Sequence, residues 1–119
     1  IFQKHERHKL AISGAAKKLN LKLFANENSL SPSITAIEAQ NFDAESFRKT
    51  IQFKYGIQLA GGQDHLKGKI FRVGHLGFIN DLDIISAITA IALTLYEKNI
   101  VTQNDIGEAL IEGKRNLER

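Results

Sequence analysis

Residues 61–77 read GGQDHLKGKIFRVGHLG, and this stretch is the most informative part of the chain about its fold. Its second half alternates like a β-strand, with Phe71 and Val73 on one face and Ile70 and Arg72 on the other. Five glycines among these seventeen residues permit turns with positive φ on both sides of the strand. We therefore expect a short strand between glycine-rich turns, with one arginine on the face opposite to Phe71 and Val73.

The segments on both sides of this strand have a helical or strand periodicity of their own. In chain order, the sequence predicts a helix over 1–19, a short strand over 21–25, a strand over 33–39, a helix over 44–55, a short strand over 57–60, the strand over 69–74, a long helix after Asn80 and a last helix after Thr102. Asp43, Asn80 and Thr102 are placed to cap the second, third and fourth helices, and Gly56 is placed to end the second.

We interpret this order as a single two-layer α+β domain over residues 1–119. Helices would pack on one face of a small, largely antiparallel sheet, and the opposite face would carry Ile70 and Arg72. Because an apolar residue lies beside an arginine on that face, we expect another domain to cover it. The chain contains no methionine, and a helical pattern is already running at Ile1, so we expect it to be a piece of a longer protein.

The composition is that of an ordinary globular protein and excludes several kinds of site. Without cysteine there is no disulfide, no thiol nucleophile and no thiolate metal site. The net charge of +3 is a weak excess, and the basic residues near the N-terminus lack interleaved aromatics, so we expect a solvated face and no nucleic-acid partner. The longest apolar region, Leu82 to Tyr96, is shorter than the ~20 residues of a membrane span, and we expect a core helix there and no membrane partner. The first residues lack the pattern of a signal peptide, so we expect a cytoplasmic protein.

The four histidines are candidate metal ligands or bases. His5 and His8 lie three residues apart on the first predicted helix, but no third ligand stands at a defined spacing. We therefore predict no metal site, and an exposed or half-buried helix face at these two positions. His65 lies in a polar turn, and His75 between glycines caps the strand end or lines a site. No pair of titratable groups has an apolar setting suited to acid–base catalysis, so we predict no catalytic residue.

Arg72 is the strongest candidate for a binding residue, and two interpretations stay open. Its planar guanidinium is suited to a carboxylate or phosphate held through two hydrogen bonds. Alternatively, it pairs with an aspartate or glutamate of the same domain. Periodicity does not decide between the two.

Residues 67–77, KGKIFRVGHLG, with the preceding glycine pair and the long helix that follows, resemble the small domain of class V aminotransferases. The likeness extends to the helix and strand over 9–25, the strand over 33–37 and the helix, strand and glycine unit over 47–62. Similar proteins are the bacterial alanine–glyoxylate and serine–pyruvate type enzymes, including the branch named soluble hydrogenase small subunit. The resemblance implies that the chain is the C-terminal small domain of a larger transaminase that uses pyridoxal phosphate.

The resemblance also implies roles for individual residues. In the family, the arginine of this motif binds the α-carboxylate of the amino-acid or keto-acid substrate, which assigns that role to Arg72. The residues expected to shape the wall of the site are Gly61, Gly62, Gly74, His75 and Gly77.

The large domain of the family supplies the Schiff-base lysine and the groups that bind the cofactor. We therefore expect this chain alone to bind no cofactor and to be inactive, and the parent to be a homodimer.

Two other functions are compatible with the residues. One is a free-standing α+β module that binds or senses amino acids with the same arginine and glycine turns. The other is a basic nucleic-acid module, which a salt-dependent gel shift would reveal.

Overall fold

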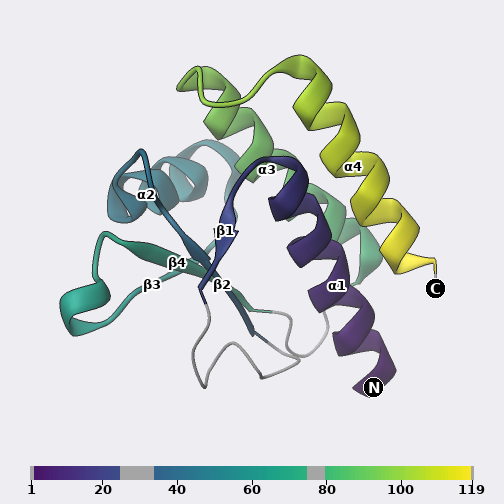
Figure 1. Cartoon of the computed structure of the whole chain (residues 1–119). Coiled ribbons are helices and arrows are strands. Elements are labelled where there is room, and N and C mark those ends of the chain that lie inside the picture. The colour runs from purple at the N-terminus through teal and green to yellow at the C-terminus, as the bar shows by residue number, and fades with distance from the viewer. Residues whose placement is uncertain (1, 25–33, 75–79, 119) are drawn as a thin grey trace.

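The computed structural model describes residues 2–24, 34–74 and 80–118, and it contains the predicted helices and strands in the predicted order (Figure 1). The elements are α1 (Phe2–Lys18), β1 (Lys22–Leu23), β2 (Ile34–Glu38), α2 (Ala44–Tyr55), β3 (Ala60–Gly61), β4 (Ile70–Gly74), α3 (Asp81–Glu97) and α4 (Gln103–Leu117). A short 3-10 helix over Asp64–Leu66, which the sequence pattern did not predict, joins β3 to β4.

The strands form one antiparallel sheet in the order β1-β2-β4-β3. β4 lies inside the sheet, and both of its neighbours pair with it at Arg72. Ala36 of β2 is the partner on one side, and Ala60 of β3 is the partner on the other. The predicted antiparallel sheet is therefore confirmed.

The helices cover one face of this sheet, and Figure 1 shows α1, α3 and α4 stacked beside one another on that side. Ile37, Phe71 and Val73 point into the same core as the buried residues of the helices. Phe47 of α2 packs against Phe71 with ring centroids 5.1 Å apart. The two-layer α+β class follows from this arrangement and matches the prediction.

The helix ends also match the prediction, because their signals are local. The Asp43 carboxylate accepts a hydrogen bond from the backbone N–H of Ser46, and Gly56 ends α2 with a φ of 70°. Asn80 and Thr102 each form a reciprocal capping box with the aspartate three residues later.

The strand predicted over 57–60 differs from the structure, where only Ala60 and Gly61 pair with β4. Leu59 is buried in the core, so the alternation in this segment reflects packing against the helices. The alternation does not reflect hydrogen bonding in the sheet.

In the described part of the chain, no helix has the length and apolar character needed to cross a membrane. α3, which contains the longest apolar region, buries its stripe of Ile84, Ile88, Ile91 and Leu95 in the core.

Candidate functional site

The face of the sheet opposite to the helices carries Ala36, Ile70, Arg72 and Gly74. Ala36 and Ile70 are buried, although neither belongs to the core under the helices. The two alanines that pair with Arg72 are small, so the long arginine side chain is bordered by short ones on both neighbouring strands. This face therefore has the arginine and the apolar residue that the alternation predicts, and the structure adds small neighbours on both adjoining strands.

Arg72 is half-buried, and its Nε donates a hydrogen bond of 3.0 Å to the carbonyl oxygen of Gly61. Among the described residues, no carboxylate lies within 4.0 Å of its guanidinium nitrogens. Within that part of the chain, the interpretation in which Arg72 pairs with an acid of its own domain has no support. The carbonyl of Gly61 instead fixes one edge of the guanidinium plane.

Gly61 is in contact with an ion pair on the helix face of the sheet. A Cβ atom at this position would lie 2.3 Å from Oε2 of Glu45 and 2.9 Å from Nε of Arg48. Arg48 donates from Nη2 to Glu45 Oε1 at 2.6 Å and from Nε to Oε2 at 3.1 Å, so the pair is bidentate. Glycine at position 61 therefore makes room for the Glu45–Arg48 pair.

The charges around Glu45 stabilise its ionised form. The hydrogen bonds from Arg48 lower the pKa of the Glu45 carboxyl below its ordinary value, with smaller contributions from Lys67 and Lys49. The pKa of Arg48 is raised by the same hydrogen bonds. The sequence spacing Glu-x-x-Arg suggests such a pair on a helix, but it does not reveal that the pair packs against Gly61.

The other predicted wall residues have different surroundings. A Cβ atom at Gly62 would lie 2.4 Å from the carbonyl oxygen of Leu66 and 2.8 Å from Cγ1 of Ile70, so the turn requires glycine there. No described atom lies within 4 Å of a Cβ placed at Gly74. His75 and Gly77 lie outside the described residues.

Described residues also line two hollows of several hundred Å³. One of about 380 Å³ lies between the segment after α2, the end of β4 and the start of α3, and it includes Gly74. Among the described residues that line it, the titratable one is Asp83, whose negative charge is unsuited to a carboxylate ligand.

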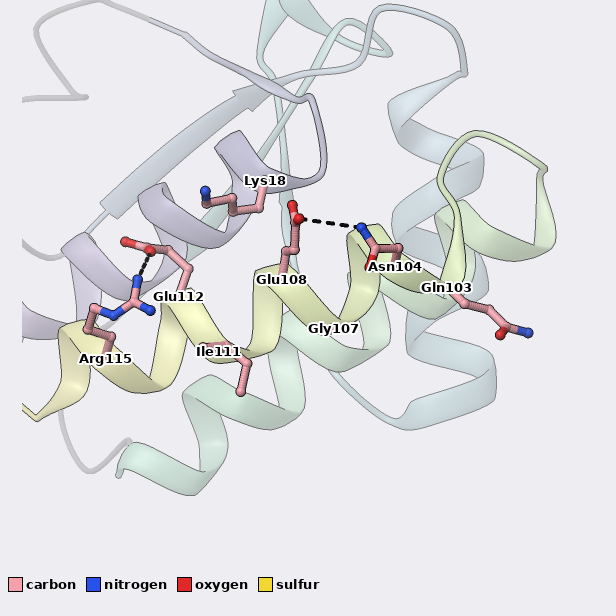
Figure 2. Close-up of a pocket in the computed structure, with 8 residues that line it drawn as sticks. All are labelled: Lys18, Gln103, Asn104, Gly107, Glu108, Ile111, Glu112 and Arg115. Atoms are coloured by element: carbon pink, nitrogen blue, oxygen red, sulfur yellow. Dashed lines mark hydrogen bonds and ion pairs between the residues drawn. The ribbon is translucent and has the colours of Figure 1, made fainter.

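The other hollow, of about 450 Å³, is the groove in Figure 2 that residues of α4 line together with Lys18 at the end of α1. Its two acids bond to residues of their own helix, Glu112 to Arg115 at 2.6 Å and Glu108 to Asn104 at 3.4 Å. None of the predicted site residues lines this groove.

His8 is fully buried, so the predicted exposed or half-buried setting is wrong for this residue. Its Nε2 lies 3.0 Å from Oδ1 of Asp81, the first residue of α3. The contact joins residues 73 positions apart, which helical periodicity alone does not reveal. Within the described residues, no group of three histidine, aspartate or glutamate side chains is arranged to hold a metal ion.

Comparison with known proteins relates the chain to the end of much longer ones. No protein-family model matches the chain. The small subunit of the soluble hydrogenase of a Synechococcus species is 50% identical over 97 residues, which are 82% of this chain and 25% of that protein. The (S)-ureidoglycine–glyoxylate transaminase of Bacillus subtilis is 30% identical over 97 residues, which are 77% of this chain and 23% of that protein.

The similarity extends to the three-dimensional structure. The crystal structure of the ureidoglycine–glyoxylate aminotransferase from Bacillus subtilis matches with a TM-score of 0.86 at 25% identity. The match covers 98% of this chain and 30% of that one. The chain spans about a quarter of the length of the curated relatives it matches, and the matching part is their C-terminal part.

Proposed function

Because the chain is homologous to the C-terminal quarter of class V aminotransferases, we propose that it is the small domain of a transaminase that uses pyridoxal phosphate. In this proposal the parent transfers an amino group between an amino acid and a 2-keto acid of the alanine or serine and glyoxylate or pyruvate type. The names of the relatives support the reaction class, since several of them are glyoxylate transaminases. The role of this chain is to bind the carboxylate of the substrate.

The observation that carries the proposal is the setting of Arg72. Its Nε is engaged by the Gly61 carbonyl, so the nitrogens that can hold a carboxylate as a fork are the two terminal ones, Nη1 and Nη2. The neighbouring Ala36 and Ala60 are too short to cover the guanidinium. Loss of one member of a buried charge-assisted pair typically costs about 2 to 5 kcal/mol, so this contact can set both affinity and orientation of the substrate.

Orientation is the contribution that such a domain makes to the rate. A substrate held by its carboxylate presents its α-carbon in one direction, which removes rotational freedom before reaction. No described atom lies within 4 Å of a Cβ placed at Gly74 on the same face, which is compatible with a close approach of the substrate or of the rest of the parent.

Pyridoxal phosphate supplies the electron-sink chemistry of amino transfer when it is bound. The lysines of this chain are all exposed or half-buried, and these settings do not fit a Schiff-base lysine in an enclosed site. We therefore assign the cofactor and its lysine to the remainder of the parent protein.

The test compares the 119-residue chain with the full-length parent. Each is incubated with pyridoxal phosphate, reduced with borohydride and analysed by mass spectrometry. We expect a stoichiometric adduct at one lysine of the parent, outside the present residues, and transamination of pyruvate or glyoxylate by the parent alone. A stoichiometric adduct at a lysine of the 119-residue chain would contradict this division of roles.

A free-standing amino-acid sensor is the second candidate function, because Arg72 lacks a described acidic partner. Calorimetric titration of the chain with alanine, serine, pyruvate and glyoxylate separates the two functions. Tight binding by the chain alone supports the sensor, since a transaminase small domain supplies only part of a site.

A further inference from the structure

The Glu45–Arg48 ion pair packs against Gly61, the residue whose carbonyl accepts the hydrogen bond from Arg72. The pair lies on the helix face of the sheet, and Arg72 lies on the opposite face. We propose that this pair positions Arg72 for the substrate carboxylate by holding Gly61, whose carbonyl accepts the hydrogen bond from Arg72 Nε. The inference rests on the proposed function, because it concerns how the carboxylate-binding arginine is oriented. Glu45 and Arg48 are positioning residues in this proposal, since neither is placed in contact with substrate.

β3 has few contacts within the sheet that could fix its position. The strand consists of Ala60 and Gly61 alone, lies at the edge of the sheet and pairs with β4 at two positions. An edge strand with one neighbour has half of its backbone hydrogen-bonding groups unpaired by the sheet. The position of the Gly61 carbonyl therefore depends on what packs against β3 from other elements.

The Glu45–Arg48 pair supplies this packing from α2, a helix that is fixed against the core. α2 is capped by Asp43 and buries Ala44, Phe47 and Ile51, so its first turns are fixed against the core. The pair formed on these turns is partly enclosed, with 13% of the Glu45 side chain and 25% of the Arg48 side chain exposed.

The contact between this pair and β3 is direct. A Cβ atom added at Gly61 would lie only 2.3 Å from Oε2 of Glu45. The carboxylate therefore packs directly against the backbone of β3. Gly61 in turn accepts the Arg72 hydrogen bond at 3.0 Å. Gly61 is therefore the single residue that links the ion pair to the guanidinium of Arg72.

An ordinary surface ion pair would not have this effect, and the chain contains a matched example. Glu112 and Arg115 of α4 have the same Glu-x-x-Arg spacing and the same N–O distance of 2.6 Å. Arg115 is 62% exposed and lies in the groove of Figure 2, which neither Gly61 nor Arg72 lines. An ion pair whose arginine is this exposed contributes little to stability. Removal of the arginine from each pair therefore separates a positioning effect from a general loss of an ion pair.

The experiment uses the full-length parent with its cofactor and compares Arg48→Ala with Arg115→Ala, with pyruvate as the keto-acid probe. We expect Arg48→Ala to raise KM for pyruvate about five- to tenfold with kcat changed less than about threefold, because a displaced guanidinium binds the carboxylate less well. Arg115→Ala should leave both constants unchanged. Arg48→Lys, which keeps a cation beside Glu45, should recover part of the loss.

A second variant disturbs the same contact without removing a charge. The methyl group of Gly61→Ala would displace the carboxylate of Glu45, which is the end of a side chain, so the variant disturbs the contact while the backbone can keep its fold. We expect this variant to raise KM for pyruvate as Arg48→Ala does. It also remains informative if Arg48→Ala proves difficult to fold.

A separate readout distinguishes failure of this inference from failure of the proposed function. Solvent exchange of the Arg72 Nε–H, followed by NMR after labelling of arginine with nitrogen-15, reports the hydrogen bond to Gly61 whatever the reaction is. Faster exchange together with a raised KM in Arg48→Ala supports the proposal. If Arg48→Ala has the same exchange rate and the same KM as Arg115→Ala, the proposal is overturned. In that case, a raised KM in Arg72→Gln would still support the proposed function. If Arg72→Gln leaves KM unchanged, the proposed function fails, and the role of the pair in substrate binding fails with it.

Discussion

Two glycines of the arginine-bearing turn and strand should respond in opposite ways to replacement by alanine. At Gly62 the added methyl would lie 2.4 Å from the backbone oxygen of Leu66 and 2.8 Å from Cγ1 of Ile70, so the turn itself must move. Overpacking of this kind costs about 1 to 3 kcal/mol. Alanine also lowers the conformational entropy of the unfolded chain relative to glycine, which stabilises the folded state by about 0.4 to 1 kcal/mol. We therefore expect Gly62→Ala to lower the free energy of unfolding by about 1 to 2 kcal/mol.

At Gly74 no described atom lies within 4 Å of the added methyl, and the residue does not have a positive φ. Only the entropy term remains, so Gly74→Ala should raise the free energy of unfolding by about 0.5 kcal/mol. Urea unfolding followed by circular dichroism measures both changes. With a slope of about 1.5 kcal/mol per molar urea, the midpoint should fall by about 1 M in Gly62→Ala and rise slightly in Gly74→Ala. An unchanged midpoint in Gly62→Ala, or a lower one in Gly74→Ala, would refute this use of the contacts.

Three other predictions concern the helices and the ion pair. Asn80→Ala and Thr102→Ala each remove one side of a capping box and should each lower the stability by about 1 kcal/mol, nearly additively, in thermal unfolding of the single and double variants. Phe47→Ala empties a fully buried position and should cost about 3 to 5 kcal/mol, and a loss below 1 kcal/mol in urea unfolding would show that this residue is not in the core. Arg48 lowers the pKa of the Glu45 carboxyl below its ordinary value of 4.5. The stabilisation by the pair is therefore complete above pH 4.5 and is lost as pH falls through the lowered pKa of the folded protein. The difference in urea midpoint between the protein and Glu45→Gln should therefore shrink between about pH 7 and pH 3, and a constant difference would count against the pair.

The sequence predicts the elements and the face of Arg72 because both depend on local periodicity. Alternation about Phe71 and Val73 places Arg72 on the opposite face wherever the strand lies in the sheet. The helix caps are also local, since Asn80 and Thr102 accept hydrogen bonds from residues three positions later. These features can therefore be predicted without knowing how the helices and strands pack together.

The features that the sequence did not predict depend on contacts between distant elements. His8 is buried because α1 crosses the start of α3, where Asp81 bonds to it. The predicted strand over 57–60 is shorter in the structure because Leu59 points into the core and only the last of these residues pairs with β4. The contact of Glu45 with Gly61 requires the relative position of α2 and β3, which the spacing of neither segment contains.

The binding of a carboxylate by Arg72 is the claim on which the proposed function depends, and propionate tests it most directly. Propionate has the carboxylate of alanine and pyruvate but no amino or keto group, so its competitive inhibition of the full-length parent reports that contact alone. We predict that Arg72→Gln raises the inhibition constant of propionate by at least about 30-fold, the equivalent of about 2 kcal/mol, with Arg72→Lys in between. Equal inhibition constants in the parent and in Arg72→Gln would contradict the account.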